Sequence, residues 1–160
     1  MARRQPGLVL VLEDIHDPHN AAAVLRTAEG FGVGTVYFIF EREKYYNPKK
    51  IGKTSSASAN KWLDIKVFRS TRDCVADLKN SGYRIFATAL SEDSISLFET
   101  KFYHGKLALL FGNEHRGLSE EAINLADKKL IIPMRGMVQS LNISVTAAIC
   151  IFEVTRQRGK

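Results

Sequence analysis

Short, unbroken runs of apolar residues alternate along this chain with segments of helical periodicity. Residues 8–12 and 107–111 are wholly apolar, a pattern typical of strands that are covered on both faces of a sheet. The further strands that we predict are residues 35–40, 65–68, 83–87 and 130–132. Because helical patterns separate these runs, we predict an α/β fold, with one doubly wound, Rossmann-like parallel sheet flanked by helices.

The composition is that of an ordinary globular domain. The chain has 160 residues, of which 45% are apolar and 25% charged, so we expect one domain spanning residues 1–160. The net charge of +6 favours a polyanionic partner, although a merely basic protein is the alternative. No run reaches the ~20 apolar residues of a membrane span, and we expect a cytoplasmic protein. Cys74 and Cys150 are isolated, which predicts reduced core residues.

Local signals place the ends of several helices. Residues 13–19 are polar and contain Pro18, so they are predicted to form a loop after the first strand. Asn20 is the predicted N-cap of the first helix, and Gly32 its end. Thr71 is the predicted cap of the next helix.

The last helix, predicted for residues 142–156, has almost no polar face. From Val145 to Val154, only Thr146 and Glu153 interrupt its apolar positions. A helix that is apolar all round is buried all round. A last helix in a small domain normally has one open face, so we expect that face to contact a second copy of the chain in a homodimer.

Two polar loops each follow a predicted strand and precede a helix, at residues 111–119 and 133–144. Carboxyl ends of parallel strands share one edge of the sheet, where ligands bind. The second loop is uncharged after Arg135 and carries Gln139 and Ser140, which indicates an uncharged or zwitterionic ligand. The first contains GxxxxG but no lysine after it, which disfavours a triphosphate. Its Glu114 suits a cationic or hydroxyl-bearing ligand; the alternatives are a solvated acid or a partner of Arg116.

Three blocks of sequence carry a resemblance to a known family. They are DPHNAAAVLRTAEGFGV at residues 17–33, LALLFGNEHRGLS at 107–119 and IIPMRGMVQSLNISVTAA at 131–148. In this order and spacing the chain resembles the SpoU/TrmH class of SPOUT RNA ribose methyltransferases. The resemblance spans nearly the whole chain.

The resemblance implies a fold, a cofactor and a site. Its fold threads the C-terminal part, here residues 84–160, into a deep trefoil knot. Such proteins bind S-adenosylmethionine between three knot loops and use no metal. The implied cofactor-binding residues are Thr88, Ala89, Leu90, Gly112, Asn113, Gly117, Ile132, Met134, Ser140 and Leu141. The four histidines show no spacing typical of metal ligands, and we expect no metal.

The implied catalytic residue is Arg26, which lies off the apolar stripe of its helix and is expected to project toward the loop end. Family accounts make this arginine a general base, yet a guanidinium pKa above 12 normally excludes proton abstraction. Arg26 is therefore either a base or a cation that stabilises the developing alkoxide. The other implied catalytic residues, with helix capping or loop structure as the alternative reading for each, are Asn20, Glu114, Ser140 and Asn142.

The implied partner is RNA, and the implied reaction is 2′-O-methylation of a ribose, with a guanosine in tRNA favoured and rRNA as the alternative. Cations that could contact phosphate are Arg3, Arg4, Lys49, Lys50, Lys53, Arg116, Arg135, Arg156 and Arg158. Two other functions stay open. One is a non-catalytic RNA-binding protein with the same fold, and the other is a nucleotide-binding enzyme that uses the GxxxxG loop.

Overall fold

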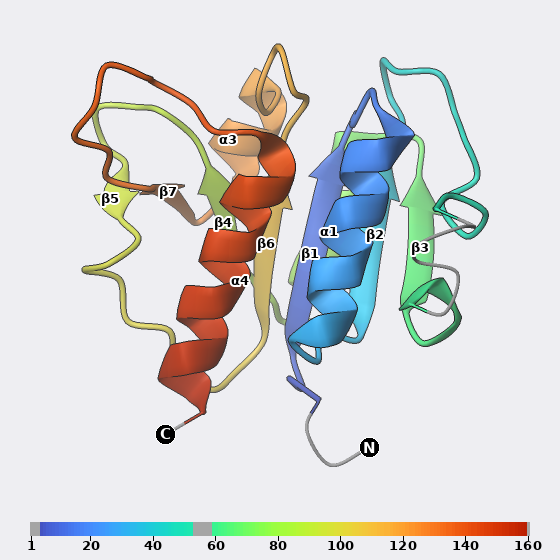
Figure 1. Cartoon of the computed structure of the whole chain (residues 1–160), viewed down its shortest axis with the longest axis horizontal. Helices are drawn as coiled ribbons and strands as arrows, with labels where there is room; N and C mark the ends of the chain where they lie inside the picture. Colours follow the sequence, from blue (N-terminus) through green and yellow to red (C-terminus); the bar gives the residue numbers. More distant parts are fainter. Residues whose placement is uncertain (1–3, 53–58, 160) are drawn as a thin grey trace.

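The fold is a single parallel sheet with helices on both faces (Figure 1). A computed structural model describes residues 4–52 and 59–159. The strands are β1 (Leu8–Glu13), β2 (Thr35–Ile39), β3 (Asp64–Phe68), β4 (Arg84–Thr88), β5 (Ile95–Ser96), β6 (Leu107–Phe111) and β7 (Lys128–Ile131). The helices are α1 (Pro18–Gly30), the 3₁₀ turn η1 (Ala59–Lys61), α2 (Thr71–Asn80), α3 (Glu120–Leu125) and α4 (Ile143–Arg158).

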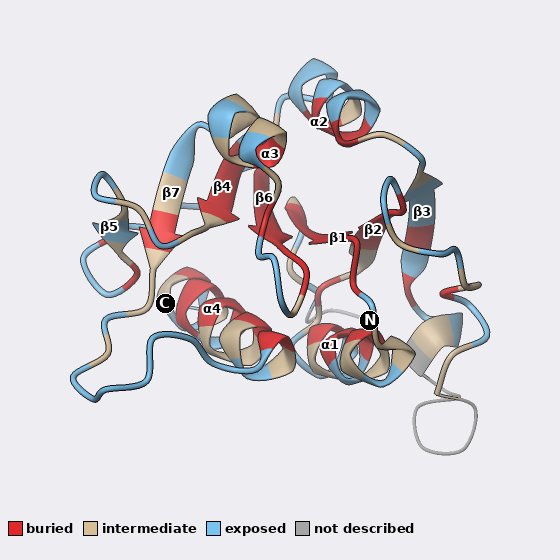
Figure 2. Cartoon of the chain, turned by 90° about the horizontal axis from the view of Figure 1, so that it is seen from above, coloured by how far each residue is buried: buried red, intermediate tan, exposed pale blue. Residues whose placement is uncertain are grey.

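The seven strands lie in the order β3-β2-β1-β6-β4-β7-β5, and every neighbouring pair is parallel. Helices α1 and α4 cover one face, and α2 and α3 cover the other, as Figure 2 shows from above. The predicted α/β class is confirmed. Because all strands run the same way, the loops that follow β1, β4, β6 and β7 meet at one edge of the sheet.

The unbroken apolar runs at residues 8–12 and 107–111 lie in the two central strands of the sheet, β1 and β6. Every residue of β1 and β6 is buried. Alternate side chains of β1 enter different cores: Leu8, Leu10 and Leu12 pack with α1 and α4, whereas Val9 and Val11 pack toward α2 and α3. A central strand in a three-layer fold has no solvent face, so no polar position interrupts the run.

One strand was missed by the sequence analysis. Ile95–Ser96 forms β5, a two-residue edge strand that pairs with β7, in a segment for which no element was predicted. Two residues are too few to show the period-2 alternation by which strands are recognised. The other predicted strands all occur, with ends that differ by one or two residues.

Two predicted helix caps are wrong by a few residues. Asp17, and not Asn20, is the N-cap of α1, and its side chain accepts a hydrogen bond from His19 N at 2.9 Å. Pro18 then takes the first helical position, where its missing N–H costs nothing. Ser70, and not Thr71, caps α2. The correction at α1 matters because it leaves the Asn20 side chain available for tertiary contacts.

Helix α4 is buried on one face and open on the other within this chain. Ala147, Cys150 and Ile151 are fully buried, but Val145 is 45% and Phe152 52% exposed. The apolar open face that was predicted is therefore present. Both cysteines are free and buried, as expected. Within the described ranges, no helix combines the length and apolar character needed to cross a membrane.

Candidate active site

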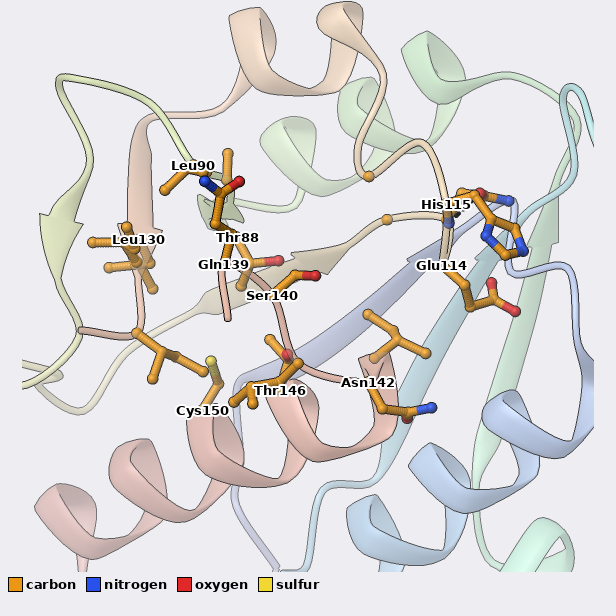
Figure 3. Close-up of a pocket in the computed structure, with 18 of the residues that line it drawn as sticks. Thr88, Leu90, Glu114, His115, Leu130, Gln139, Ser140, Asn142, Thr146 and Cys150 are labelled. Atoms are coloured by element: carbon orange, nitrogen blue, oxygen red, sulfur yellow. Dashed lines mark hydrogen bonds between the residues drawn. The ribbon is translucent and has the colours of Figure 1, made fainter. Parts of the chain in front are cut away.

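A pocket of about 670 Å³ opens at the carboxyl edge of the sheet. The loops after β4, β6 and β7 line it, together with residues before and within α1 and the first turns of α4 (Figure 3). All ten predicted cofactor-binding residues lie in its wall: Thr88, Ala89, Leu90, Gly112, Asn113, Gly117, Ile132, Met134, Ser140 and Leu141. The three loops that the family resemblance implies for cofactor binding therefore line one cavity.

The pocket wall also includes mainly apolar residues that were not predicted from the sequence. They are Leu97, Leu130, Ile131, Ile143, Thr146 and Cys150. Thr146 and Cys150 follow Asn142 by four and eight positions, so they share one face of α4, and this spacing could have identified them. At the rim, Leu90 is 72% exposed, which leaves a large apolar side chain to be covered by a ligand.

The loop after β6 has a conformation that only its sequence permits. A Cβ at Gly112 would lie 2.1 Å from Leu118 N, and Gly117 has a positive φ of 68°. The buried Asn113 side chain holds the loop: its amide donates to Asp14 O at 2.8 Å, and its oxygen accepts from His115 N at 2.9 Å. The polar atoms of the Asn113 side chain therefore hold the loop in its conformation, and Asn113 affects the pocket through the shape of that loop.

Glu114 joins this loop to the start of α1. Its carboxylate accepts hydrogen bonds from His16 N at 2.9 Å, Asp17 N at 2.8 Å and Asn20 Nδ2 at 3.2 Å. Burial acts to raise the pKa of Glu114, but the N–H groups of Asp17 and His16 outweigh it and hold the pKa below its ordinary value. Neither alternative reading of Glu114 holds, because it is bonded within the fold and Arg116 pairs instead with Glu43, at 2.9 Å.

Asn142 extends the same network to the third loop. Its Nδ2 donates to Asn20 Oδ1 at 3.2 Å, while its Oδ1 accepts from Ser144 N at 2.8 Å and so caps α4. The Asn142 side chain thus both caps α4 and contacts Asn20, so the helix-capping role and a role at the site are compatible. Ser140 lines the pocket nearby. Glu114, Asn20 and Asn142 form a continuous hydrogen-bonded chain through the three sequence blocks.

Arg26 lies apart from this network. It is exposed on α1, off the buried stripe that includes Val24 and Leu25, as predicted. It is not among the residues that line the pocket of its own chain, so the expectation that it projects toward the loop end finds no support here.

The predicted RNA-binding cations are scattered. Arg4 donates to Trp62 O at 2.8 Å and precedes β1, so it lies near the amino ends of the strands, away from the pocket at their carboxyl ends. Arg135 is exposed in the loop after β7. Arg3 and Lys53 lie outside the described residues. The assignment of Arg158 is wrong, because its side chain is buried and donates to Gly105 O at 2.9 Å. The other assignments stay predictions.

The described ranges contain no group of three or more His, Cys, Asp or Glu side chains that could hold a metal ion.

The whole chain is similar in sequence to known RNA methyltransferases. A tRNA (guanosine(18)-2′-O)-methyltransferase of Thermus thermophilus is 42% identical over 163 residues, covering 100% of this chain and 80% of the relative.

Two solved structures extend the comparison. The A. aeolicus TrmH/SpoU tRNA modifying enzyme superposes with a TM-score of 0.88 at 34% identity, covering 98% of this chain and 78% of that one. The SpoU methyltransferase AviRb from Streptomyces viridochromogenes, in complex with AdoMet, has a TM-score of 0.77 at 25% identity, with coverage of 98% and 61%. The profile of the SpoU rRNA Methylase family matches residues 7–152. This chain therefore belongs to the SpoU rRNA methylase family, as its three sequence blocks indicated.

Proposed function

We propose that this protein transfers a methyl group from S-adenosylmethionine to the 2′-hydroxyl of a ribose in RNA, and that the methylated nucleotide is a guanosine in tRNA. The observation that carries the proposal is the union of three distant sequence blocks in one pocket, joined through Glu114, Asn20 and Asn142. The names of the relatives support tRNA, and the predicted location is the cytoplasm.

The residues around the pocket fit the proposed cofactor. A volume of about 670 Å³ lies within the ~300–1,000 Å³ of small-molecule sites. Leu90, Ile132 and Leu141 offer apolar contacts to a flat purine. Gly112 also lines the pocket, and its missing Cβ leaves room for the loop's own backbone at Gly117 and Leu118. Thr88 and Ser140 supply neutral polar groups. When bound, S-adenosylmethionine supplies an electrophilic methyl group.

The chain's own residues must position a ribose hydroxyl and manage its proton. A ribose hydroxyl is a poor nucleophile, so alignment and stabilisation of the developing alkoxide lower the barrier. We assign the second task to Arg26, because a guanidinium stays charged and donates hydrogen bonds but does not accept a proton. Asn20 and Asn142, which orient each other, would present amide groups to the substrate. Ser140 would contact cofactor or ribose.

Arg26 would reach the pocket of a second copy. It is exposed and does not line the pocket of its own chain, whereas Val145 and Phe152 leave an apolar face open on the neighbouring α4. Phe152 also touches Phe31, just after α1, with ring centroids 6.2 Å apart, which makes the apolar face continuous across α1 and α4. A homodimer through the last helix and the knot region would cover this face and complete each site. The trefoil knot of residues 84–160 is part of the same proposal.

Labelled methyl donor tests the reaction directly. Purified protein is incubated with S-adenosylmethionine and an unmodified tRNA transcript, and the labelled nucleotide is mapped. We expect one labelled guanosine, and no label in a transcript that carries a 2′-deoxyguanosine at the mapped position. Methyl transfer to that deoxy transcript would exclude 2′-O-methylation. Label in rRNA fragments but not in tRNA would move the substrate to rRNA, and binding without any transfer would leave only an RNA-binding protein.

Mixed dimers test the shared site. Arg26→Ala and Asn142→Ala proteins, each inactive as a homodimer, are mixed after mild dissociation. A site completed by Arg26 of the second copy predicts that about a quarter of the sites, those with neither substitution, regain activity when the subunits exchange freely. No recovery with verified exchange would place both residues in one chain's site. The pH dependence of single-turnover methylation in Arg26→Lys and Arg26→Ala separates the two roles of the arginine, and near-wild-type activity of Arg26→Lys would remove the need for a guanidinium.

A further inference from the structure

The segment after β2, residues 41–50, starts at the edge of the sheet where the strands end and continues beside β3 (Figure 1), and most of its residues are exposed. We call it the strip. Asp14, buried at the end of β1 with a positive φ of 51°, fixes its start. One oxygen of Asp14 accepts hydrogen bonds from the backbone N–H groups of Glu41, Arg42 and Glu43, at 2.9, 3.0 and 3.1 Å. Three converging donors on one carboxylate hold the strip in a defined conformation.

The acidic and basic side chains at the start of the strip have different surroundings. Glu41 accepts from Thr71 N at 2.7 Å, and Glu43 contacts His16 at 2.8 Å and Arg116 at 2.9 Å. Both acids are therefore engaged with neighbouring segments. Arg42, between the two acids, and Lys44, which follows them, are exposed and, within the described part of the chain, have no ion-pair partner. The exposed side of the strip is consequently cationic.

An aromatic ring lies beside these cations. Tyr45 is 42% exposed, and the Arg69 guanidinium carbon lies 4.5 Å from its ring centroid. The ring also makes an edge contact with Phe40, with centroids 5.2 Å apart at 78°, and Phe40 is buried in the core. Tyr45 is thus anchored from beneath, and the Tyr45–Arg69 stack is presented at the surface.

We propose that the Tyr45–Arg69 stack is a docking platform for a base of the RNA substrate, flanked by cations that contact its phosphates. Exposed aromatic rings and guanidinium planes stack on any base, and single-stranded loops offer such bases. The flanking cations are Arg42, Lys44, Lys49 and Lys50, all exposed. This inference rests on the proposed function and adds a place on the molecule where the substrate is held.

The platform lies close to the pocket. His16, which lines the pocket, is bonded to Glu43, and Glu43 precedes Tyr45 by two residues, a backbone span of about 7 Å. Tyr46 ties the strip to the same segment by donating to Ile15 O at 2.9 Å. A base held on the platform would therefore belong to a nucleotide near the methylated one, and we expect the platform to act on RNA affinity and not on cofactor affinity.

Binding of a fluorescent tRNA transcript tests the platform. We expect Tyr45→Ala to raise the RNA Kd by about 5- to 150-fold, the usual effect of losing one base–aromatic stack, whereas Tyr45→Phe should retain most of the affinity. Tyr103→Ala is the matched control, because Tyr103 is also exposed but belongs to another segment. Equal RNA affinity of the Tyr45→Ala protein, the control and the wild type would overturn the proposal.

Two further measurements keep the outcome clear. Lys44→Gln should lower the slope of log Kd against log salt concentration by about 1, the value expected for the loss of one phosphate contact. Lys101→Gln, which changes an exposed lysine elsewhere, should leave the slope unchanged. Calorimetric binding of S-adenosylhomocysteine must be unchanged in the Tyr45→Ala protein, since weaker binding would mean a disturbed pocket and would refute a separate platform. If the wild type binds RNA through Tyr45 yet transfers no methyl group, the proposed function fails while the platform stands.

Discussion

Replacing Glu114 by glutamine probes the contact that joins the second sequence block to the first. The carboxylate accepts from His16 N through one oxygen, and from Asp17 N and Asn20 Nδ2 through the other. A glutamine has one acceptor oxygen. In its better orientation it keeps the two bonds to Asp17 and Asn20, but it turns an NH₂ group toward His16 N–H, so one charge-assisted bond is lost and two donors face each other.

The expected size of the effect follows from that lost bond. A hydrogen bond to a charged group contributes roughly 1.5–3 kcal/mol. Because Glu114 is only partly buried, we take the lower end, about 1.5–2 kcal/mol, which corresponds to a fall in Tm of about 3–8 °C for a domain of this size.

The pH dependence of the effect has a definite sign. In the folded protein the pKa of Glu114 lies below its ordinary value of 4.5, because N–H donation from Asp17 and His16 outweighs burial. A carboxylate with a depressed folded pKa stabilises the fold above the unfolded pKa, and this contribution disappears as pH falls through the folded pKa. The Tm difference between wild type and Glu114→Gln should therefore be full at pH 7 and shrink below pH 4.5.

Thermal unfolding of both proteins between pH 3 and pH 7 measures this difference, with Glu99→Gln as the control because Glu99 is exposed. The control should unfold with the wild type at every pH. Equal Tm values for Glu114→Gln and the wild type at pH 7 would refute the reasoning, and so would a difference that persists unchanged at the lowest pH.

Three other substitutions test separate parts of the structure. Gly112→Ala should abolish calorimetric binding of S-adenosylhomocysteine, because its Cβ would lie 2.1 Å from backbone; wild-type affinity would show that the loop can move aside. Phe152→Glu should convert the proposed dimer to a monomer in sedimentation, since it places a charge on the open face of α4; an unchanged sedimentation coefficient would locate the interface elsewhere. The hydrogen bond to Glu43 raises the pKa of His16 above 6.5, so NMR titration should find a lower His16 pKa in Glu43→Gln, and an equal value would mean that the pair is not formed in solution.

Much of the fold and of the pocket wall could be predicted from local sequence. Hydrophobic runs identified β1 and β6 because a strand buried on both faces needs an apolar residue at every position. Two polar loops after strands pointed to one edge of the sheet, and the family resemblance supplied the residues of the pocket wall. The failures were also local. The cap of α1 was assigned to Asn20, three residues beyond Asp17, because both residue types favour that position.

The sequence by itself determined the elements other than the short strand β5, their parallel arrangement and the family, since these depend on patterns within short stretches. The tertiary structure decided what the polar residues do. Asn20 meets Glu114 across 94 residues and Asn142 across 122, and Asp14 orders a strip that begins after a different strand. Such pairings depend on how strands are ordered and how loops pack at the sheet edge, and no local periodicity encodes that order.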